Sequence, residues 1–274
     1  MIAAIPPTIR FSCRDGAIVN IHTRVSGRAK RFTLKLSDGI FSLVVPKGAS
    51  EQALSSAMRH FSDWIEDRHI ESLLYNNNKE LPKTIEFPLE KKTYTVSLYP
   101  TLNDLYTRIA EAKGLSYARP RDSSKVIYCL EFENSVELHG DVEMKQLGAY
   151  ALQIWSRRKA DILLVKYVRK VAKDLNISIA KVTVRDQKSR WGSCSGKMGQ
   201  LFNISINWRA LLLPVELVTH LCHHELCHVS HMNHSPEFHK KMLEINPHAE
   251  DLEDQLNRAW KKLPWWSKHI EFLD

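Results

Sequence analysis

Three histidines and a glutamate share a short stretch of the chain at a spacing that suits metal chemistry. Residues 224–228 read HELCH, and His234 follows six residues after His228. In an α-helix, side chains four positions apart are offset by only about 40° around the axis. His224 and His228 are therefore expected to project from one helix face, one turn apart, as two ligands of a single metal ion do.

Glu225 lies about 100° around the same helix from His224, close enough to reach a water molecule beside the metal without being a ligand. Two histidines with a glutamate after the first form the HExxH pattern of zinc hydrolases, in which the glutamate is the general base. Three protein ligands leave the fourth position of the metal open for water. The spacing therefore predicts a Zn²⁺ site formed by His224, His228 and His234, with Glu225 as the catalytic base.

Other side chains near this motif are rival ligands. His231 competes with His234 only if the helix continues, and Asn233 favours a helix end because asparagine tolerates the left-handed conformation. His239 is a second rival close to the site. The thiolate of Cys194 is a chemically sensible zinc ligand, but three histidines already complete the protein share of a catalytic site. We therefore expect Cys194 to be structural.

Further motifs surround the HELCH stretch. Residues 189–195 read SRWGSCS, residues 201–207 read LFNISIN, and residues 233–238 read NHSPEF. Together these motifs resemble the YgjP-like metallopeptidase family, a branch of the zincins, most specifically over residues 140–250. The resemblance implies a zincin-like catalytic core and a polypeptide substrate. It also makes Arg190 the candidate cation that helps to stabilise an oxyanion, beside the alternative of a structural arginine paired with a carboxylate.

Hydrophobic periodicity predicts the elements that must position these residues. Apolar residues at helical spacing predict helices over residues 50–75 and about 142–175, before the metal-site helix. Trp191 and the tryptophans near residue 265 are expected to pack in the core. Alternation predicts strands over residues 31–36, 41–45, 93–98, 126–131, 181–185 and 201–207.

These elements predict an α+β fold, in which a mixed sheet and an active-site helix form a zincin-like core after a β-rich N-terminal region. We expect a β-rich region with one helix over residues 1–140 and a metal-binding catalytic domain over residues 141–274. Residues 201–207 are expected to be an edge strand that pairs with an extended peptide. Residues 101–121 are interpreted as an insertion.

Composition limits the class of protein. A chain of 274 residues with 43% hydrophobic content can bury a large core. No apolar run approaches the roughly 20 residues of a membrane span, and the first residues lack the basic start and apolar region of a secretory signal. The five cysteines are scattered without a CxxC pair, which is typical of reduced thiols in a cytoplasmic protein.

Positive charge is concentrated in one segment. Residues 157–197 hold twelve Lys and Arg against three Asp, a net +9 that exceeds the +8 of the whole chain. This segment suits nucleic acid, a nucleotide or another anionic partner, or it is a solvated helix face balanced by the acidic residues at 250–254. Two alternatives to a zinc peptidase follow: a metal-dependent nucleoside triphosphate hydrolase, and a nucleic-acid-associated protease-like module. The oligomeric state stays open.

Overall fold

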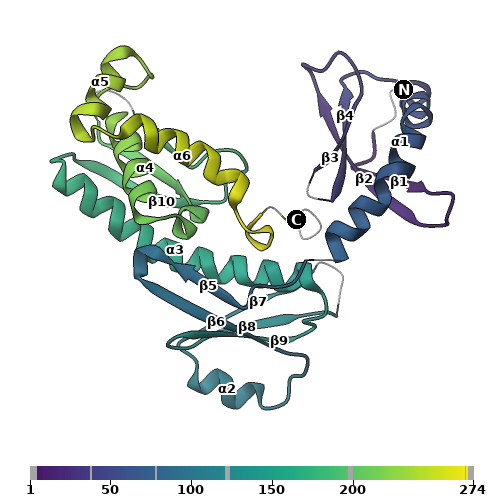
Figure 1. The fold of residues 1–274 in the computed structure, drawn as a ribbon, viewed down its shortest axis with the longest axis horizontal. Helices are drawn as coiled ribbons and strands as arrows, with labels where there is room; N and C mark the ends of the chain where they lie inside the picture. Colours follow the sequence, from purple (N-terminus) through teal and green to yellow (C-terminus); the bar gives the residue numbers. More distant parts are fainter. Residues whose placement is uncertain are drawn as a thin grey trace. The chain divides into compact units, whose positions relative to one another are not determined.

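Two compact units make up the chain, Met1–Glu80 and Leu81–Asp274. The computed structural model describes residues 5–37, 39–77, 79–120, 124–196, 200–268 and 270, and Figure 1 labels its helices and strands. The boundary expected near residue 140 falls inside the second unit. The reason is that one hydrophobic core extends from Leu81 to Trp266 and includes residues on both sides of that position.

The first unit is a four-stranded sheet with one long helix packed on it. The strand order is β1-β2-β4-β3, with β2 and β4 parallel and the other pairs antiparallel. Phe41, Leu43 and Val45 are buried because alternate side chains of a strand share one face, and Met58 and Phe61 of the helix pack against them. The predicted strands at residues 31–36 and 41–45 and the predicted helix at residues 50–75 are confirmed, although Asp38, between the two strands, lies outside the described residues. The elements are β1 (Thr8–Ser12), β2 (Ile18–Ser26), β3 (Thr33–Ser37), β4 (Ile40–Pro46) and α1 (Glu51–Asn77).

The second unit begins with a five-stranded sheet of order β5-β6-β9-β8-β7. Strands β6 and β9 are parallel, and the other neighbours are antiparallel. Residues 101–121, interpreted as an insertion, contain a short helix and the strand that forms one edge of this sheet. The elements are β5 (Thr84–Phe87), η1 (Pro88–Glu90), β6 (Lys92–Tyr99), α2 (Leu105–Glu111), β7 (Gly114–Ala118), β8 (Ile127–Glu131) and β9 (Ser135–Gly140).

One 30-residue helix, α3 (Lys145–Asp174), joins this sheet to the rest of the unit. Its buried residues recur at helical spacing, from Leu147 and Ala151 to Leu164 and Val168. The helix contacts β7 and β8 on one side and β10 (Ile179–Arg185) on the other. Figure 1 shows α3 between the five-stranded sheet and the layer that contains β10 and α4.

The second layer is built on a small sheet of order β10-β12-β11, where β11 is Gly192–Ser195 and β12 is Phe202–Asn207. β12 pairs in parallel with β10 and antiparallel with β11. The expectation that residues 201–207 form an edge strand is therefore wrong, because both edges of β12 are paired. β11 is the edge strand on the side of the HELCH helix, which it contacts.

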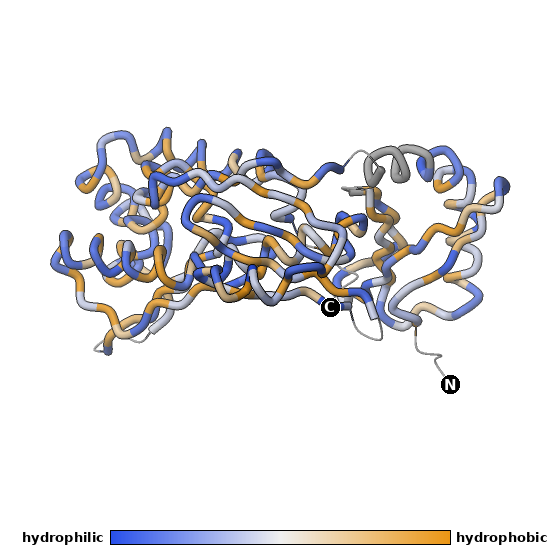
Figure 2. The backbone as a smooth tube through the Cα atoms, turned by 90° about the horizontal axis from the view of Figure 1, so that it is seen from below, coloured by the Kyte–Doolittle hydropathy of each residue, from blue (hydrophilic) through white to orange (hydrophobic). Residues whose placement is uncertain are grey.

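Helical segments complete the second unit: η2 (Trp208–Leu212), α4 (Val215–Cys227), α5 (Pro236–Ile245), α6 (Ala249–Lys262) and η3 (Trp265–Ser267). The α+β fold class with a strand-rich N-terminal region is confirmed. The five cysteines are free thiols. Hydrophobic and hydrophilic residues alternate in short stretches along the backbone (Figure 2). None of the helices that the structure describes combines the length and the apolar character that a membrane crossing needs.

Candidate metal centre

Helix α4 carries the HELCH stretch and ends earlier than the sequence predicts. Its last residue is Cys227, and His228 follows as the C-cap with helical dihedral angles of φ −62° and ψ −18°. The backbone N–H of His231 donates to the carbonyl oxygen of Cys227 at 3.0 Å, and this hydrogen bond closes a turn directly after the helix. Asn233 therefore lies beyond the helix end, and the turn after His228 leads the chain to His234.

His224, His228 and His234 offer ring nitrogens that all lie within 4.8 Å of one another. The Nε2 atoms of His224 and His234 are 3.1 Å apart. The Nδ1 of His228 donates to the carbonyl oxygen of His231 at 3.0 Å. This hydrogen bond fixes the orientation of the ring and leaves Nε2 to bind a metal ion. Three converging imidazoles are a donor set that fits a divalent transition metal. The structure thus brings together the three histidines that the sequence singles out.

Burial favours the neutral form of two of these imidazoles, and packing supports all three. Burial lowers the pKa of His228 and of His234, and this favours the neutral form that a metal requires. The ring of Phe238, only 2% exposed, lies with its centroid 5.1, 4.7 and 4.8 Å from those of His224, His228 and His234. Phe238 belongs to the NHSPEF motif and lies in the first turn of α5, so this helix supports all three rings.

Glu253 of α6 is a functional candidate that sequence reasoning missed. Its Oε2 lies 2.9 Å from Nε2 of His220 and 3.2 Å from Nδ1 of His224. These hydrogen bonds, first that of His220 and then that of His224, hold the pKa of Glu253 well below its usual range. In the sequence, Glu253 is one member of an acidic cluster, and nothing in its spacing indicates that α6 packs beside α4.

Glu225 is buried between α4 and β11, at 4% exposure. A Cβ atom added to Gly192 would lie 2.4 Å from its Oε1, so the glutamate fits only because residue 192 has no side chain. Its Oε2 has no hydrogen-bond partner among the described residues. Burial raises the pKa of Glu225 to about 7, against the opposing positive charge of His224.

The SRWGSCS motif leads into β11 and is held by two buried side chains. Asn207 Nδ2 donates to the carbonyl oxygens of Gln187 and Arg190, at 2.7 and 2.9 Å. Trp191 donates from Nε1 to the carbonyl oxygen of Leu256 at 3.0 Å, so it is a core anchor as expected. The Arg190 side chain is exposed and forms no ion pair within the part of the chain that the structure describes.

Among the described residues, none of the rival ligands joins His224, His228 and His234 in a group that could hold a metal ion. His231 contributes its carbonyl oxygen to His228, while its own Nδ1 lies 2.9 Å from the hydroxyl of Ser230. His239 is exposed and lines the cavity beside the site. Cys194 belongs to no group of described side chains that could hold a metal ion, and burial raises its pKa to about 11.

A second group that could hold a metal lies in the first unit and consists of Cys13, Glu66 and His69. Both ring nitrogens of His69 are already engaged, with the carbonyl oxygen of Glu66 at 2.6 Å and the carboxylate of Asp15 at 2.8 Å. A histidine bonded at both nitrogens offers no free lone pair to a metal. The α4 group is therefore the better metal centre.

The basic segment at residues 157–197 is partly neutralised within the protein. Arg157 forms an ion pair with Asp186, and the half-buried Lys159 lies 3.1 and 3.0 Å from carboxylate oxygens of Glu90 and Glu131. Lys197 lies outside the described residues. Charges that are paired inside the fold contribute little to a surface for an anionic partner.

The comparison with protein families decides the class of the protein. The family model of the YgjP-like metallopeptidase domain matches residues 30–259. The chain belongs to this family. The YgjP-like match spans the three histidines, Glu225 and the SRWGSCS motif, and it makes the protein a metal-dependent peptidase, a hydrolase of polypeptides.

One solved structure resembles this YgjP-like chain, the crystal structure of the metallopeptidase zymogen of Pyrococcus abyssi abylysin. The two share 24% sequence identity and a TM-score of 0.31, and the similarity covers 36% of this chain and 94% of abylysin. No curated protein matches the YgjP-like chain.

Proposed function

We propose that the protein is a zinc-dependent metallopeptidase in which His224, His228 and His234 hold Zn²⁺ and Glu225 is the general base. The observation that carries this proposal is the convergence of three imidazoles, whose ring nitrogens lie within 4.8 Å of one another. The buried carboxyl group of Glu225 follows directly after His224 on the same helix. When bound, zinc supplies Lewis-acid chemistry that makes water nucleophilic near neutral pH and polarises a carbonyl oxygen.

Glu225 moves the proton. A general base works best when its pKa lies near the operating pH, and burial raises the pKa of this carboxyl group to about 7. Its buried Oε2 forms no other hydrogen bond among the described residues, so no other donor competes with a water molecule for it. The protonated carboxyl can then donate that proton to the amine that leaves as the peptide bond breaks.

Arg190 is the proposed helper cation. Its exposed side chain carries no partner within the described residues, and its positive charge is close enough to lower the pKa of Glu225, against the larger effect of burial. A guanidinium can stabilise the oxyanion that develops as water attacks a peptide carbonyl. Asn207 supports this role because it holds the backbone of Arg190 at the start of β11.

The free edge of β11 is the proposed binding site for the scissile peptide. Among the described residues β11 pairs with β12 alone, so it has unpaired backbone groups on its other side. Gly192 of this strand lies directly against Glu225. An extended substrate added to this edge would pass the catalytic carboxyl with its main chain hydrogen-bonded to β11.

The test compares zinc-loaded wild type with Glu225→Gln on a mixture of unfolded-protein peptides, analysed by mass spectrometry for new termini. We expect cleavage by the wild type and a loss of at least about 100-fold in Glu225→Gln, because general bases contribute about 10²–10⁴ to the rate. Glu216→Gln, an exposed position in the first turn of the same helix, is the matched control and should cleave normally.

The same reactions include nucleoside triphosphates and short RNA and DNA strands. Nucleotide products that form only when Glu225 is present would indicate a phosphoanhydride hydrolase and would contradict the proposed zinc peptidase. Salt-sensitive nucleic-acid binding without any cleavage would favour the protease-like module. Equal peptide cleavage by wild type and Glu225→Gln would remove Glu225 as the base.

A further inference from the structure

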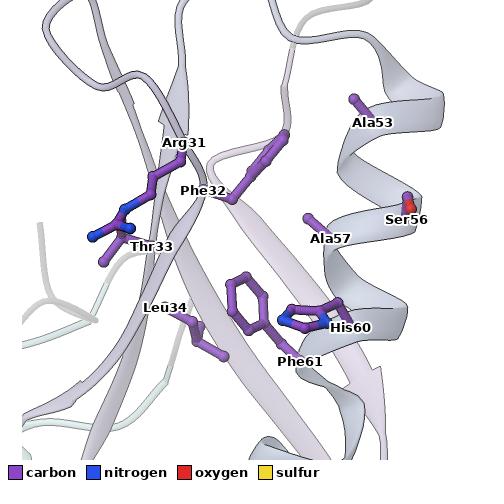
Figure 3. Close-up of a pocket in the computed structure, with 9 residues that line it drawn as sticks. All are labelled: Arg31, Phe32, Thr33, Leu34, Ala53, Ser56, Ala57, His60 and Phe61. Atoms are coloured by element: carbon purple, nitrogen blue, oxygen red, sulfur yellow. The ribbon is translucent and has the colours of Figure 1, made fainter.

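A groove in the first unit lies between β3 and α1 (Figure 3). It has a volume of about 730 Å³ and is lined by residues 31–34 on one side and by Ala53, Ser56, Ala57, His60 and Phe61 of α1 on the other. All of these residues belong to the first unit, so the groove is separate from the proposed metal centre. An open groove of this size beside a strand can hold a short extended peptide.

The strand that borders the groove is the edge of its sheet. Within the described residues β3 pairs with β4 alone, in the order β1-β2-β4-β3. Along an edge strand every second residue directs its backbone N–H and C=O away from the sheet. A further strand can pair with these groups at the usual distance of about 4.8 Å.

The helix wall leaves room for such a strand. Ser56 and Ala57 follow Ala53 by three and four residues, so both lie on the same face of α1 as Ala53. None of the three carries a bulky side chain. Figure 3 shows Ala53 and Ala57 on the side of α1 toward β3, with Phe61 directed toward Leu34. Phe61 and Leu34 are only half-buried, although both pack on the core of the unit. An apolar side chain of an added strand would cover them.

The charge of the groove indicates the chemistry of its occupant. The ionisable groups that line it are Arg31 and His60, and no carboxylate lines it. Arg31 is exposed and forms no ion pair among the described residues. A segment with acidic side chains directed to solvent would therefore gain a charge-assisted contact with Arg31 at one end of the groove.

We propose that this groove is a docking site for an extended, acidic polypeptide segment, which adds to the free edge of β3 as a fifth strand of the sheet. The backbone of the segment pairs with β3, alternate apolar side chains cover Leu34 and Phe61, and a carboxylate contacts Arg31. The site uses no residue of the metal centre, so it provides a second and non-catalytic place where this peptidase binds polypeptide.

The experiment measures binding of a fluorescein-labelled peptide to the full chain carrying Glu225→Gln, which prevents cleavage and separates docking from catalysis. The probe alternates valine with glutamate over about seven residues, a usual strand length. Ser56→Trp fills the groove, and we expect it to weaken binding at least about tenfold. Ser55→Trp is the matched control, since Ser55 is the neighbouring exposed serine and does not line the groove.

Backbone pairing and charge are tested separately. Two versions of the peptide are N-methylated on alternate amides, one set for each edge of the strand. Since only one edge faces β3, one version should lose binding and the other keep it. Arg31→Glu should weaken binding, whereas Arg10→Glu on β1, the opposite edge strand, makes the same charge change and should not.

Equal affinity of Ser56→Trp and Ser55→Trp would overturn the proposal, provided that circular dichroism shows both variants folded. Equal binding of both methylated peptides would overturn backbone pairing with β3. A groove occupied by a second copy of this chain would give a concentration-dependent dimer in sedimentation that Ser56→Trp abolishes, and this result would also replace the proposal.

Discussion

At the residue scale, the orientation of the proposed ligands depends on groups that are not ligands. His228 is held by the carbonyl oxygen of His231 and His224 by Glu253, each through the ring nitrogen Nδ1. Hydrogen bonds of this kind fix the tautomer and the plane of an imidazole before a metal binds. The carboxylate of Glu253 also makes the bonded imidazole more electron-rich, which strengthens a bond to a cation.

Glu253→Gln tests this contribution. We expect the variant to bind zinc about 10–100-fold more weakly, the range found when a carboxylate partner of a histidine ligand is removed. Competition with a fluorescent chelator measures the affinity. Asp254→Asn is the control, because the carboxylate of Asp254 pairs with the exposed Arg258 at 3.2 Å and is hydrogen-bonded to no histidine among the described residues. An affinity of Glu253→Gln equal to that of the control would contradict the proposed role.

The sequence predicted the grouping of His224, His228, His234 and Glu225 because their spacing within and just after one helix is local information. The contributions of Glu253 and Phe238 could not be predicted in the same way. Each reaches the histidines only when another helix packs on α4, and the sequence pattern of an amphipathic helix does not specify its neighbour.

At the element scale, the small sheet shows what alternation can and cannot predict. In β12 the residues Phe202, Ile204 and Ile206 are buried, while Asn203 is exposed. This alternation correctly predicted a strand with one buried face. Whether a strand is central or at an edge depends on the strands beside it. These strands pair through backbone groups, which do not affect the alternation of side chains along the sequence. The interpretation of residues 201–207 as an edge strand failed for this reason.

Asn207→Ala tests how β12 positions the loop before β11. The amide of Asn207 donates to the part-buried carbonyl oxygens of Gln187 and Arg190, and an acceptor that loses its partner costs about 1–3 kcal/mol where water cannot replace it. We expect a lower free energy of unfolding in urea and slower peptide cleavage, since the loop carries Arg190. Asn203→Ala on the exposed face of the same strand should change the free energy of unfolding by no more than about 0.5 kcal/mol and should leave the rate of cleavage unchanged.

At the scale of the whole molecule, the division into two compact units has thermodynamic consequences. The three histidines belong to the second unit, so the zinc ion that we propose they hold would stabilise that unit by binding its folded form. At a free zinc concentration 100 times the dissociation constant this amounts to about 2.7 kcal/mol. We expect calorimetry to resolve two unfolding transitions, and zinc should raise the midpoint temperature of one of them. Hydrogen exchange should place the added protection within residues 81–274, and protection shared equally with residues 5–77 would contradict the prediction.

The first unit has its own pH dependence through His69. Hydrogen bonds to the carbonyl oxygen of Glu66 and to Asp15 raise the pKa of His69, while the pKa of Asp15 is lowered, first by its bond from the backbone of Ala17. The folded unit therefore binds the His69 proton more tightly than the unfolded chain, whose value is about 6.5. This stabilisation is complete below that value and is lost as pH rises through the raised pKa.

We accordingly expect the melting temperature of the first unit to fall as the pH rises from about 6.5 through the raised pKa of His69. His69→Gln should flatten this dependence, and His60→Gln, at an exposed position of the same helix, should retain it. A slope that is identical in His69→Gln and wild type would assign the effect to other groups.

The long-range hydrogen bonds of the second unit also set an order of events during synthesis. Gln153 of α3 donates to the carbonyl oxygen of Trp266, 113 residues later, and the buried Arg209 donates to that of Ser267. A ribosome makes α3 and the HELCH helix well before these partners emerge. Until then Arg209 lacks part of the hydrogen bonding that a buried guanidinium requires, and Glu253 has not yet reached His224. The nascent chain therefore acquires the contact of Glu253 with His224 only after α6 has been translated, and the buried Arg209 acquires its full hydrogen bonding only after η3 follows. Cleavage by a chain that still lacks α6 is accordingly disfavoured.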